Sequence, residues 1–379
     1  MQRIAFQAIG VLFGVVASLV TLEVAVRILL PGKYWEFRDA TDDWQLDSRL
    51  GWTQRGNLNV STRIDSEWIE FKTNADGLLP PNAQYNKRTR HTARILMLGD
   101  STVVGRAVPE QSRVHHQLEL ALAKRGIPAE VMNAGVQGYS TDQELLRLEQ
   151  LVPTYTPDIV IVAVCTNDFG QNYVDQASGI NKPHFELQRN GGLRYFPPDP
   201  QTRISRLGTG LSATLQRSAL YRAIQPALLR LRAQVGGWEN RNMLGLASDV
   251  YYSREAFDKV GFELFEALLT RMHVSSASVG ARFYFYLHPA VEEVWLPFIA
   301  DSIRQAGIPP NRYDPYVYER KMREIASRNE LRFIPQISEF RSRPNDGPFH
   351  LLPRDPHCNA TCYKITAAIL ADQIALDLK

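Results

Sequence analysis

Four short polar segments of the sequence together supply the side chains of a serine acyl-transfer site. They are, in chain order, Gly99-Asp100-Ser101, the glycine turn that ends at Gly138, Thr166-Asn167-Asp168 and Asp355-Pro356-His357. A serine hydroxyl is too weakly acidic to attack an ester by itself, so a nearby base must take its proton. The segments therefore predict a nucleophile, its base and donors for an oxyanion.

In this interpretation Ser101 is the nucleophile and His357 is the base, while Asp355 orients the imidazole and stabilises its charged form. The backbone N–H groups of Ser101 and Gly138 and the amide of Asn167 would donate to the oxyanion. Loss of one such donor typically costs about 100- to 1000-fold in rate. Each segment alone also fits a strand end, a loop cap or a turn before a helix. Their order in the chain favours the catalytic interpretation.

The elements that must position these segments alternate between strands and helices. Apolar runs at 95–98 and 158–164 are typical of parallel strands buried on both faces, and 129–135 reads as a third strand. Helical spacing predicts a helix over 110–124 and another that stops near Pro153. This alternation predicts a three-layer α/β domain whose polar segments lie at the carboxyl ends of the strands, where open sheets bind ligands.

The second of these helices begins near residue 141 with two capping-box options, Ser140 with Gln143 or Thr141 with Glu144. The alternation resumes after residue 250. The expected elements there are helices over 254–273, 291–305 and 316–328, strands over 282–289 and 331–335, and an amphipathic helix over 359–378.

Residues 1–31 are expected to form a membrane anchor. The stretch 4–22 carries no charge and is about long enough to cross the hydrocarbon core as a helix. An uncleaved transmembrane helix is favoured over a signal peptide because the apolar character continues past Glu23 without a convincing cleavage site. The flanking charges weakly favour a cytoplasmic N-terminus. The chain is therefore expected to be single-pass, with its body extracytoplasmic or periplasmic.

Two regions flank or interrupt the main domain, which is expected over 91–379. Residues 32–90 predict a small β-rich lead-in, in which Trp52, Trp68 and Phe71 indicate burial; an interdomain stalk is the alternative. An insertion at about 170–250 contains a hairpin that turns at Asn190-Gly191-Gly192, followed by a helical stretch. It is interpreted as a lid, or equally as a solvent-facing or membrane-resting decoration.

Composition narrows the function classes. The chain has 379 residues, of which 44% are hydrophobic, and this is ample for a packed core. Its 43 basic and 40 acidic residues give a net charge of +3, so no nucleic-acid footprint is indicated. No cofactor or metal is predicted, and the sequence identifies no protein partner.

Three cysteines are too few for a disulfide scaffold and lack metal-ligand spacing with histidines. Cys358 and Cys362 are expected to be two small buried side chains and not a bridge, and a bridge between Cys165 and Cys358 is disfavoured. The pair His115-His116 is expected to be a surface or packing pair without partners, and His288 a hydrogen-bonded structural histidine.

The four segments resemble the blocks of the SGNH/GDSL hydrolase superfamily, which carry Ser, Gly, Asn and His in this order. The resemblance covers about residues 95 to 378, apart from the insertion. It implies a flavodoxin-like α/β/α sandwich with a parallel sheet, Ser101 as nucleophile, Gly138 and Asn167 in the oxyanion hole, and His357 with Asp355 as the base pair. The anchor and the lead-in resemble those of membrane-attached bacterial members.

Three departures from the family pattern stand out. The first block reads GDST in place of GDSL, which leaves the nucleophile unchanged. Cys165-Thr166 precedes Asn167 where two glycines often stand, and this changes the pocket near the oxyanion hole. One residue separates Asp355 from His357 where two are commoner.

The sequence thus predicts a membrane-anchored, extracytoplasmic serine esterase that removes acetyl or other short acyl groups from a glycan or lipid through an acyl-enzyme. An O-acyltransferase that modifies a cell-surface polysaccharide would use the same triad, with an alcohol as acceptor in place of water. A non-catalytic binding or assembly module on the same scaffold is the third alternative.

Overall fold

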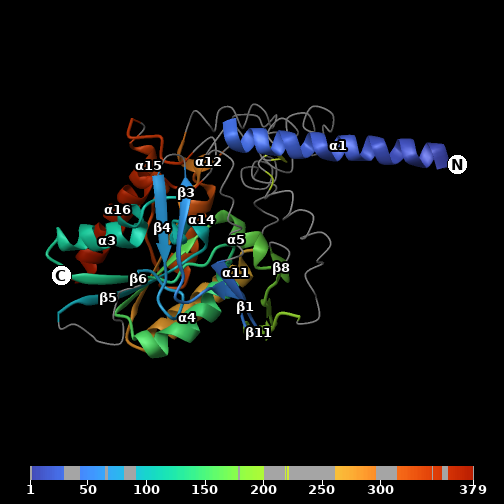
Figure 1. Cartoon of the computed structure of the whole chain (residues 1–379). Helices are drawn as coiled ribbons and strands as arrows, with labels where there is room; N and C mark the ends of the chain where they lie inside the picture. The colour runs from blue at the N-terminus through green and yellow to red at the C-terminus, as the bar shows by residue number, and fades with distance from the viewer. Residues whose placement is uncertain are drawn as a thin grey trace.

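The computed structural model describes residues 2–29, 43–64, 67–80, 91–177, 180–199, 218, 220–221, 261–295, 314–343, 345–351 and 357–378. Its central sheet has five parallel strands in the order β13-β12-β7-β5-β6. Two of them, β5 and β6, are labelled in Figure 1. The strands are β5 (Ala93–Leu98), β6 (Ala129–Asn133), β7 (Ile159–Val164), β12 (Arg282–Leu287) and β13 (Arg332–Phe333). The parallel sheet of the expected α/β class is confirmed.

Helices cover both faces of this sheet. The chain runs from β5 outward to β6 and then returns to β7 on the other side of β5. Right-handed crossovers therefore place α3 (Val114–Ala123) and α4 (Thr141–Tyr155) on opposite faces. The terminal helix α16 (Ala360–Leu378) packs on α3, α11 (Glu263–Ala277) packs on α4, and α14 (Val317–Arg328) contacts β12 and β13. The order of strands changes direction at β5, so β5 ends at a topological switch point.

The remaining elements are shorter, apart from α1 (Gln2–Leu29). They are β1 (Trp44–Asp47), β2 (Gly51–Gln54), β3 (Asn59–Ile64), β4 (Glu67–Lys72), α2 (Ser101–Val104), η2 (Glu110–Ser112), α5 (Thr166–Gln171), β8 (Gln176–Ala177), β9 (Ile180–Asn181), β10 (His184–Leu187), β11 (Leu193–Phe196), α12 (Val291–Val294) and α15 (Ile337–Arg341). The expected hairpin at Asn190-Gly191 is confirmed as the antiparallel pair β10–β11.

The described part of the lead-in contains two antiparallel pairs, β1–β2 and β3–β4, and its Leu79 forms an isolated antiparallel bridge with Asn133 at the end of β6. Trp52 and Phe71 are buried as expected, whereas Trp68 is 58% exposed. Alternate residues of a strand point to opposite faces, so Trp68 lies on the outer face of β4 while Phe71 points inward. Trp52 Nε1 donates to Gln137 O at 3.0 Å and Tyr139 Oη donates to Trp52 O at 2.6 Å. The lead-in therefore holds the turn that follows β6.

Helix α4 corrects two expectations. It continues through Pro153 to Tyr155 and ends at Thr156, which has a φ of 40°. Neither capping box forms at its start, because Ser140 Oγ donates to Asp142 Oδ1 at 2.8 Å. The same carboxylate oxygen accepts the Gln143 N–H at 2.7 Å and so caps the helix.

The transmembrane helix expected within residues 1–31 falls on α1, which the structure places at Gln2–Leu29. In the part of the chain that is described, no helix combines the length and the apolar character needed to span a membrane. Glu23 and Arg27 form an ion pair near the end of α1, and Glu23 accepts hydrogen bonds from Ser218 Oγ and Leu220 N at 2.8 and 2.9 Å. The extracytoplasmic location stays a prediction.

Glu119 on α3 gives the fold a pH-dependent stability. Burial, reinforced by the charge of Glu130, raises the pKa of Glu119 from 4.5 to about 7, although its Oε1 accepts the Val131 N–H at 2.8 Å. The folded chain therefore binds more protons than the unfolded chain between these values, and stability falls as the pH rises through this window. Glu119→Gln keeps an acceptor for Val131. We expect equal stability of variant and parent at about pH 4 and a variant more stable by up to about 3 kcal/mol at about pH 8, measured by urea unfolding. A difference that stays constant with pH would contradict this assignment.

Candidate active site

Ser101 lies directly after β5, at the first position of α2. Asp100 caps this short helix, because its Oδ1 accepts from Thr102 N at 2.9 Å and from Thr102 Oγ1 at 2.8 Å. From α16, Tyr363 Oη donates to Thr102 O at 2.9 Å. The hydroxyl is thus presented at the carboxyl edge of the sheet by a turn that is held from two sides.

Gly99 allows this turn to pack closely. A Cβ at Gly99 would overlap the Val103 side chain and would lie 3.2 Å from Ala163 Cβ. The Gly99 carbonyl also accepts the Val136 N–H at 3.0 Å, which links the turn to the one that follows β6. No side chain fits at residue 99 without a shift of α2.

Gly99→Ala should therefore destabilise the fold by about 1–3 kcal/mol, since added atoms in a packed site force backbone shifts. It should also slow acyl transfer of the expected kind by moving Ser101. Urea unfolding and ester hydrolysis measure the two effects. Gly170→Ala is the matched control: that helical glycine is exposed and has nothing within 4 Å of an added Cβ, so a change of no more than about 1 kcal/mol is expected. Equal behaviour of the two variants would refute the packing argument.

His357 reaches Ser101 from the segment before α16. Its Nε2 lies 2.8 Å from Ser101 Oγ. The backbone is fixed on both sides of the ring, because Leu351 N donates to His357 O at 3.0 Å and Asn359 N donates to Phe349 O at 2.9 Å. Ser101 and His357 are 256 residues apart in the chain, and the fold brings them into hydrogen-bonding contact. Asp355 lies outside the described residues.

A cavity of about 160 Å³ opens at this pair. Its walls are formed by Ser101, Val104, Gly105, Arg106, Ala107, Gln137, His357 and Tyr363. The Arg106 guanidinium lies over the Phe71 ring at 4.8 Å and pairs with Asp43, so the lead-in holds one wall of the cavity.

The other two expected site residues lie at neighbouring strand ends. Gly138 is in the turn after β6 with a φ of 78°, a conformation that favours glycine, and its neighbour Gln137 lines the cavity. Asn167 is half-buried on α5 after β7, where its Nδ2 donates to Gln171 Oε1 at 3.3 Å. An amide carries two N–H donors, so this bond leaves Asn167 with a second one.

A sequence comparison decides the family. A model described as "GDSL-like Lipase/Acylhydrolase family" matches residues 97–365, which include Ser101 and His357. The chain belongs to this family. One curated relative, an arylesterase from Vibrio mimicus, is 35% identical over 105 residues, which are 28% of this chain and 41% of the relative. The match thus spans less than half of that relative's length.

Solved structures similar to this GDSL-family chain include two esterases or acylhydrolases. The acetyl xylan esterase AlAXEase has 15% identity and a TM-score of 0.40, with 74% of this chain and 99% of that chain covered. A lipase/acylhydrolase from Enterococcus faecalis has 14% identity and a TM-score of 0.40, with 76% and 97% covered.

A buried hydrogen-bond chain beneath α2 was not expected from the sequence of this GDSL-family protein. His115 is buried, with Nε2 2.7 Å from Glu110 Oε1 and Nδ1 3.1 Å from Asn133 Nδ2. Asn133 Nδ2 also donates to Val103 O at 2.6 Å, and its Oδ1 accepts the Gly135 N–H at 3.0 Å. Burial lowers the pKa of His115, although Glu110 opposes this, so the ring is neutral and donates through Nε2. This series of hydrogen bonds therefore links α2 to the turn after β6.

Buried acidic groups lie behind the nucleophile turn. Lys182 pairs with Asp142, and both side chains have no exposed surface. Burial raises the pKa of Glu144 and Asp168 well above ordinary values, and the charges of neighbouring carboxylates add to this effect. Both carboxyl groups therefore hold a proton more tightly than an exposed carboxyl group does. The sequence indicated Glu144 only as a capping residue and gave no partner for Lys182.

Of the three cysteines, Cys358 and Cys362 differ from the expectation. The structure joins Cys358 to Cys362 by a disulfide, where two thiols were expected. These residues come together because Cys362 lies in the first turn of α16 and Cys358 lies two residues before that helix begins, so their Cα atoms are 5.3 Å apart. Cys165 is a buried free thiol whose Sγ lies 3.4 Å from Asp100 Oδ1. His288 is buried and lies 3.6 Å from Cys358 Sγ through its Nε2.

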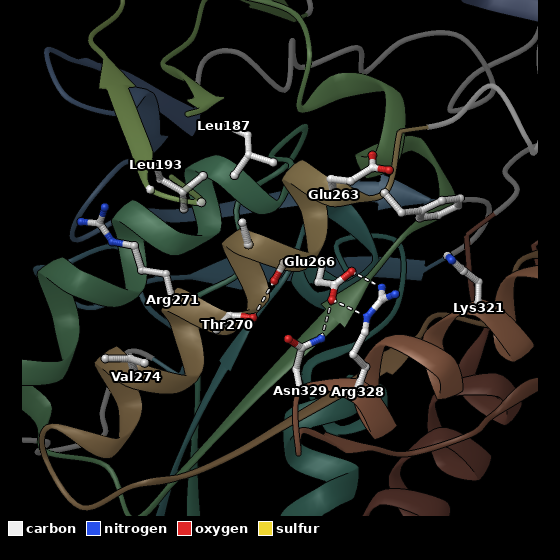
Figure 2. A pocket seen from close by; sticks show the side chains of 14 residues that line it. Leu187, Leu193, Glu263, Glu266, Thr270, Arg271, Val274, Lys321, Arg328 and Asn329 are labelled. Carbon is white, nitrogen blue, oxygen red and sulfur yellow. Dashed lines mark hydrogen bonds and ion pairs between the residues drawn. The ribbon is translucent and has the colours of Figure 1, made fainter. Parts of the chain in front are cut away.

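A second, larger hollow of about 750 Å³ lies between the β10–β11 hairpin, α11 and α14 (Figure 2). Glu266 binds Arg328 and Asn329 on its wall, and the side chains that line it include no serine, cysteine or histidine. The described part of the insertion, through Leu187 and Leu193, thus lines this hollow and not the Ser101 cavity. Apart from Ser218, Leu220 and Tyr221, the expected helical stretch of the insertion lies outside the described residues.

Proposed function

We propose that this chain is a serine esterase that hydrolyses short acyl esters through an acyl-enzyme. The observation that carries the proposal is the 2.8 Å contact between Ser101 Oγ and His357 Nε2 beside a small cavity. Membership of the GDSL-like lipase/acylhydrolase family supports the same reaction class.

In the proposed mechanism His357 Nε2 takes the proton of Ser101 as the hydroxyl oxygen attacks the ester carbonyl. The Ser101 and Gly138 N–H groups and the Asn167 amide donate to the oxyanion. The imidazolium then gives its proton to the departing alkoxide, which leaves Ser101 acylated. Water, deprotonated by His357, releases the acid and restores the enzyme. By the family resemblance, Asp355 orients the ring.

The size of the cavity favours short acyl groups. A cavity of about 150 Å³ in another protein holds one benzene molecule. The 160 Å³ beside Ser101 therefore accommodates an acyl group of a few carbon atoms. We propose acetyl esters as the first substrates, with the alcohol part, a glycan or lipid hydroxyl, extending outward.

The experiment compares hydrolysis of aryl esters from acetate to decanoate by the full chain. We expect the highest kcat/KM for acetate to butyrate and a fall of at least about tenfold by octanoate, since several methylenes would lie outside the pocket. A phosphonate probe should label Ser101, as located by peptide mass analysis.

The same experiment separates the alternatives. Acyl transfer to an added sugar alcohol that exceeds hydrolysis would assign an O-acyltransferase. Neither hydrolysis, transfer nor labelling by the folded protein would exclude catalysis at this site and leave a binding module. A preference for long acyl chains would contradict the argument from cavity size.

A further inference from the structure

Behind His357, four buried nitrogen- and sulfur-bearing side chains converge from three parts of the chain. His288 follows the end of β12 and Cys362 lies in the first turn of α16. His350 and Cys358 face each other across an isolated antiparallel bridge. His288 is 6% exposed and the other three are 2% exposed or less.

The donor atoms of this cluster have spacings that suit a single metal ion. A ring nitrogen of His350 and the two sulfurs lie within 4.8 Å of one another. His288 Nε2 lies 3.6 Å from Cys358 Sγ. In a tetrahedral zinc site the ligand atoms are separated by about 3.6 Å for N and S and about 3.8 Å for two sulfurs. Once the sulfur–sulfur bond opens, small side-chain shifts therefore give this geometry.

The surroundings prepare both histidines as ligands. His350 Nε2 lies 2.9 Å from Pro289 O and donates to it, so Nδ1 carries the lone pair. Metal-binding histidines are commonly oriented by such a bond from the second ring nitrogen to a carbonyl. His288 is held in place by its backbone N–H, which donates to Val164 O at 2.8 Å.

We propose that the reduced chain binds one divalent zinc-like cation through Cys358, Cys362, His350 and His288. Two thiolates and two imidazoles in tetrahedral arrangement are a donor set that zinc prefers. A thiol or phosphine reductant supplies two electrons, two protons enter from solvent, and the disulfide becomes two thiols. Metal binding then releases both thiol protons to solvent. The site is closed, so its role is structural: it joins the end of β12, the His350 segment and α16 around His357. This inference does not rest on the proposed esterase activity.

Cobalt(II) is the probe, because its absorption reports both geometry and thiolate ligation. The full chain is reduced with a phosphine, its three thiols are counted, and cobalt is titrated under argon. We expect one cobalt ion per reduced chain, with tetrahedral d–d bands and a thiolate charge-transfer band, displacement by one equivalent of zinc, and no binding by the oxidised chain. This comparison needs no variant.

Variants then assign the ligands. Cys358→Ser and Cys362→Ser should each remove about half of the charge-transfer intensity and weaken binding by more than the roughly 10- to 100-fold that loss of an outer-shell partner costs. His350→Gln and His288→Gln should shift the d–d bands and keep the charge-transfer band. Cys165→Ser is the matched control and should bind as the parent does, because this buried thiol lies beside Asp100, outside the cluster.

Several results would overturn the proposal. One is the absence of cobalt binding by folded protein with three counted thiols. Others are binding that survives loss of both Cys358 and Cys362, a disulfide that resists the reductant in the folded chain, and loss of the fold on reduction as seen by circular dichroism. Each would leave the cluster as a disulfide flanked by two structural histidines.

Discussion

Ser101→Ala should lower kcat for a short-chain aryl ester by at least about 10⁴-fold, because the group that forms the acyl-enzyme is gone. His357→Ala should cause a loss of similar size, since the base that lies 2.8 Å from Ser101 Oγ is then missing. The double variant should be no slower than either single variant, because the two residues act as one unit. Steady-state hydrolysis with a purified, folded protein measures all three.

Ser278→Ala is the control for this series. Ser278 is exposed at the end of α11, and its hydroxyl donates to Ser275 O. Its replacement should leave kcat within about twofold of the parent, since exposed substitutions away from special features have small effects. Activity retained by Ser101→Ala, or additive losses in the double variant, would remove Ser101 and His357 from the roles proposed for them.

Lys182→Met should destabilise the fold by about 3–5 kcal/mol, the cost of leaving one partner of a buried ion pair uncompensated. Lys182 Nζ also donates to Gln171 O at 3.1 Å and Val174 O at 3.2 Å, so both carbonyls lose a donor. Asp142 would take up a proton instead of remaining charged. The loss should therefore be larger at about pH 8 than at about pH 5, because a raised pKa makes stability fall as the pH rises. Urea unfolding at the two pH values measures this.

Two further variants test the buried pair as a pair. Asp142→Asn combined with Lys182→Met should recover part of the lost stability, because no buried charge then remains. Lys321→Met removes a partly exposed partner of Glu324 and should cost less than about 1 kcal/mol. If Lys182→Met were as mild as Lys321→Met at both pH values, the pair would have no such role.

Much of the fold follows from local pattern. Continuous apolar runs such as Ile159–Val164 are predictable as buried parallel strands because both of their faces are covered. The polar residue after each run then lies at the same edge of the sheet. This geometry, with the order of the family blocks, was enough to expect Ser101 and His357 in one place.

The contacts that hold the site were not predictable in the same way. Asn133 and His115 come from β6 and α3, and neither periodicity nor a motif specifies that their side chains meet beneath α2. Lys182 and Asp142 are 40 residues apart, and their pairing depends on the fold bringing the residue after β9 to the first turn of α4. The expected capping boxes of α4 do not form for the same reason. The carboxylate that caps this helix belongs to Asp142, which is fixed by its ion pair with Lys182.

Because β6 is an edge strand of the sheet, the lead-in also has a second role, which is to cover the end of this strand. Leu79 N donates to Asn133 O at 3.0 Å and Asn133 N donates to Leu79 O at 2.9 Å, so the end of this outer strand is already paired. An outer strand with unsatisfied N–H and C=O groups is a template for pairing between molecules. A chain shortened to begin after residue 90 would lack this cover. It should self-associate through β6 as well as lose the support of the turn beside Ser101, so recombinant production should keep the segment from Asp43 onward.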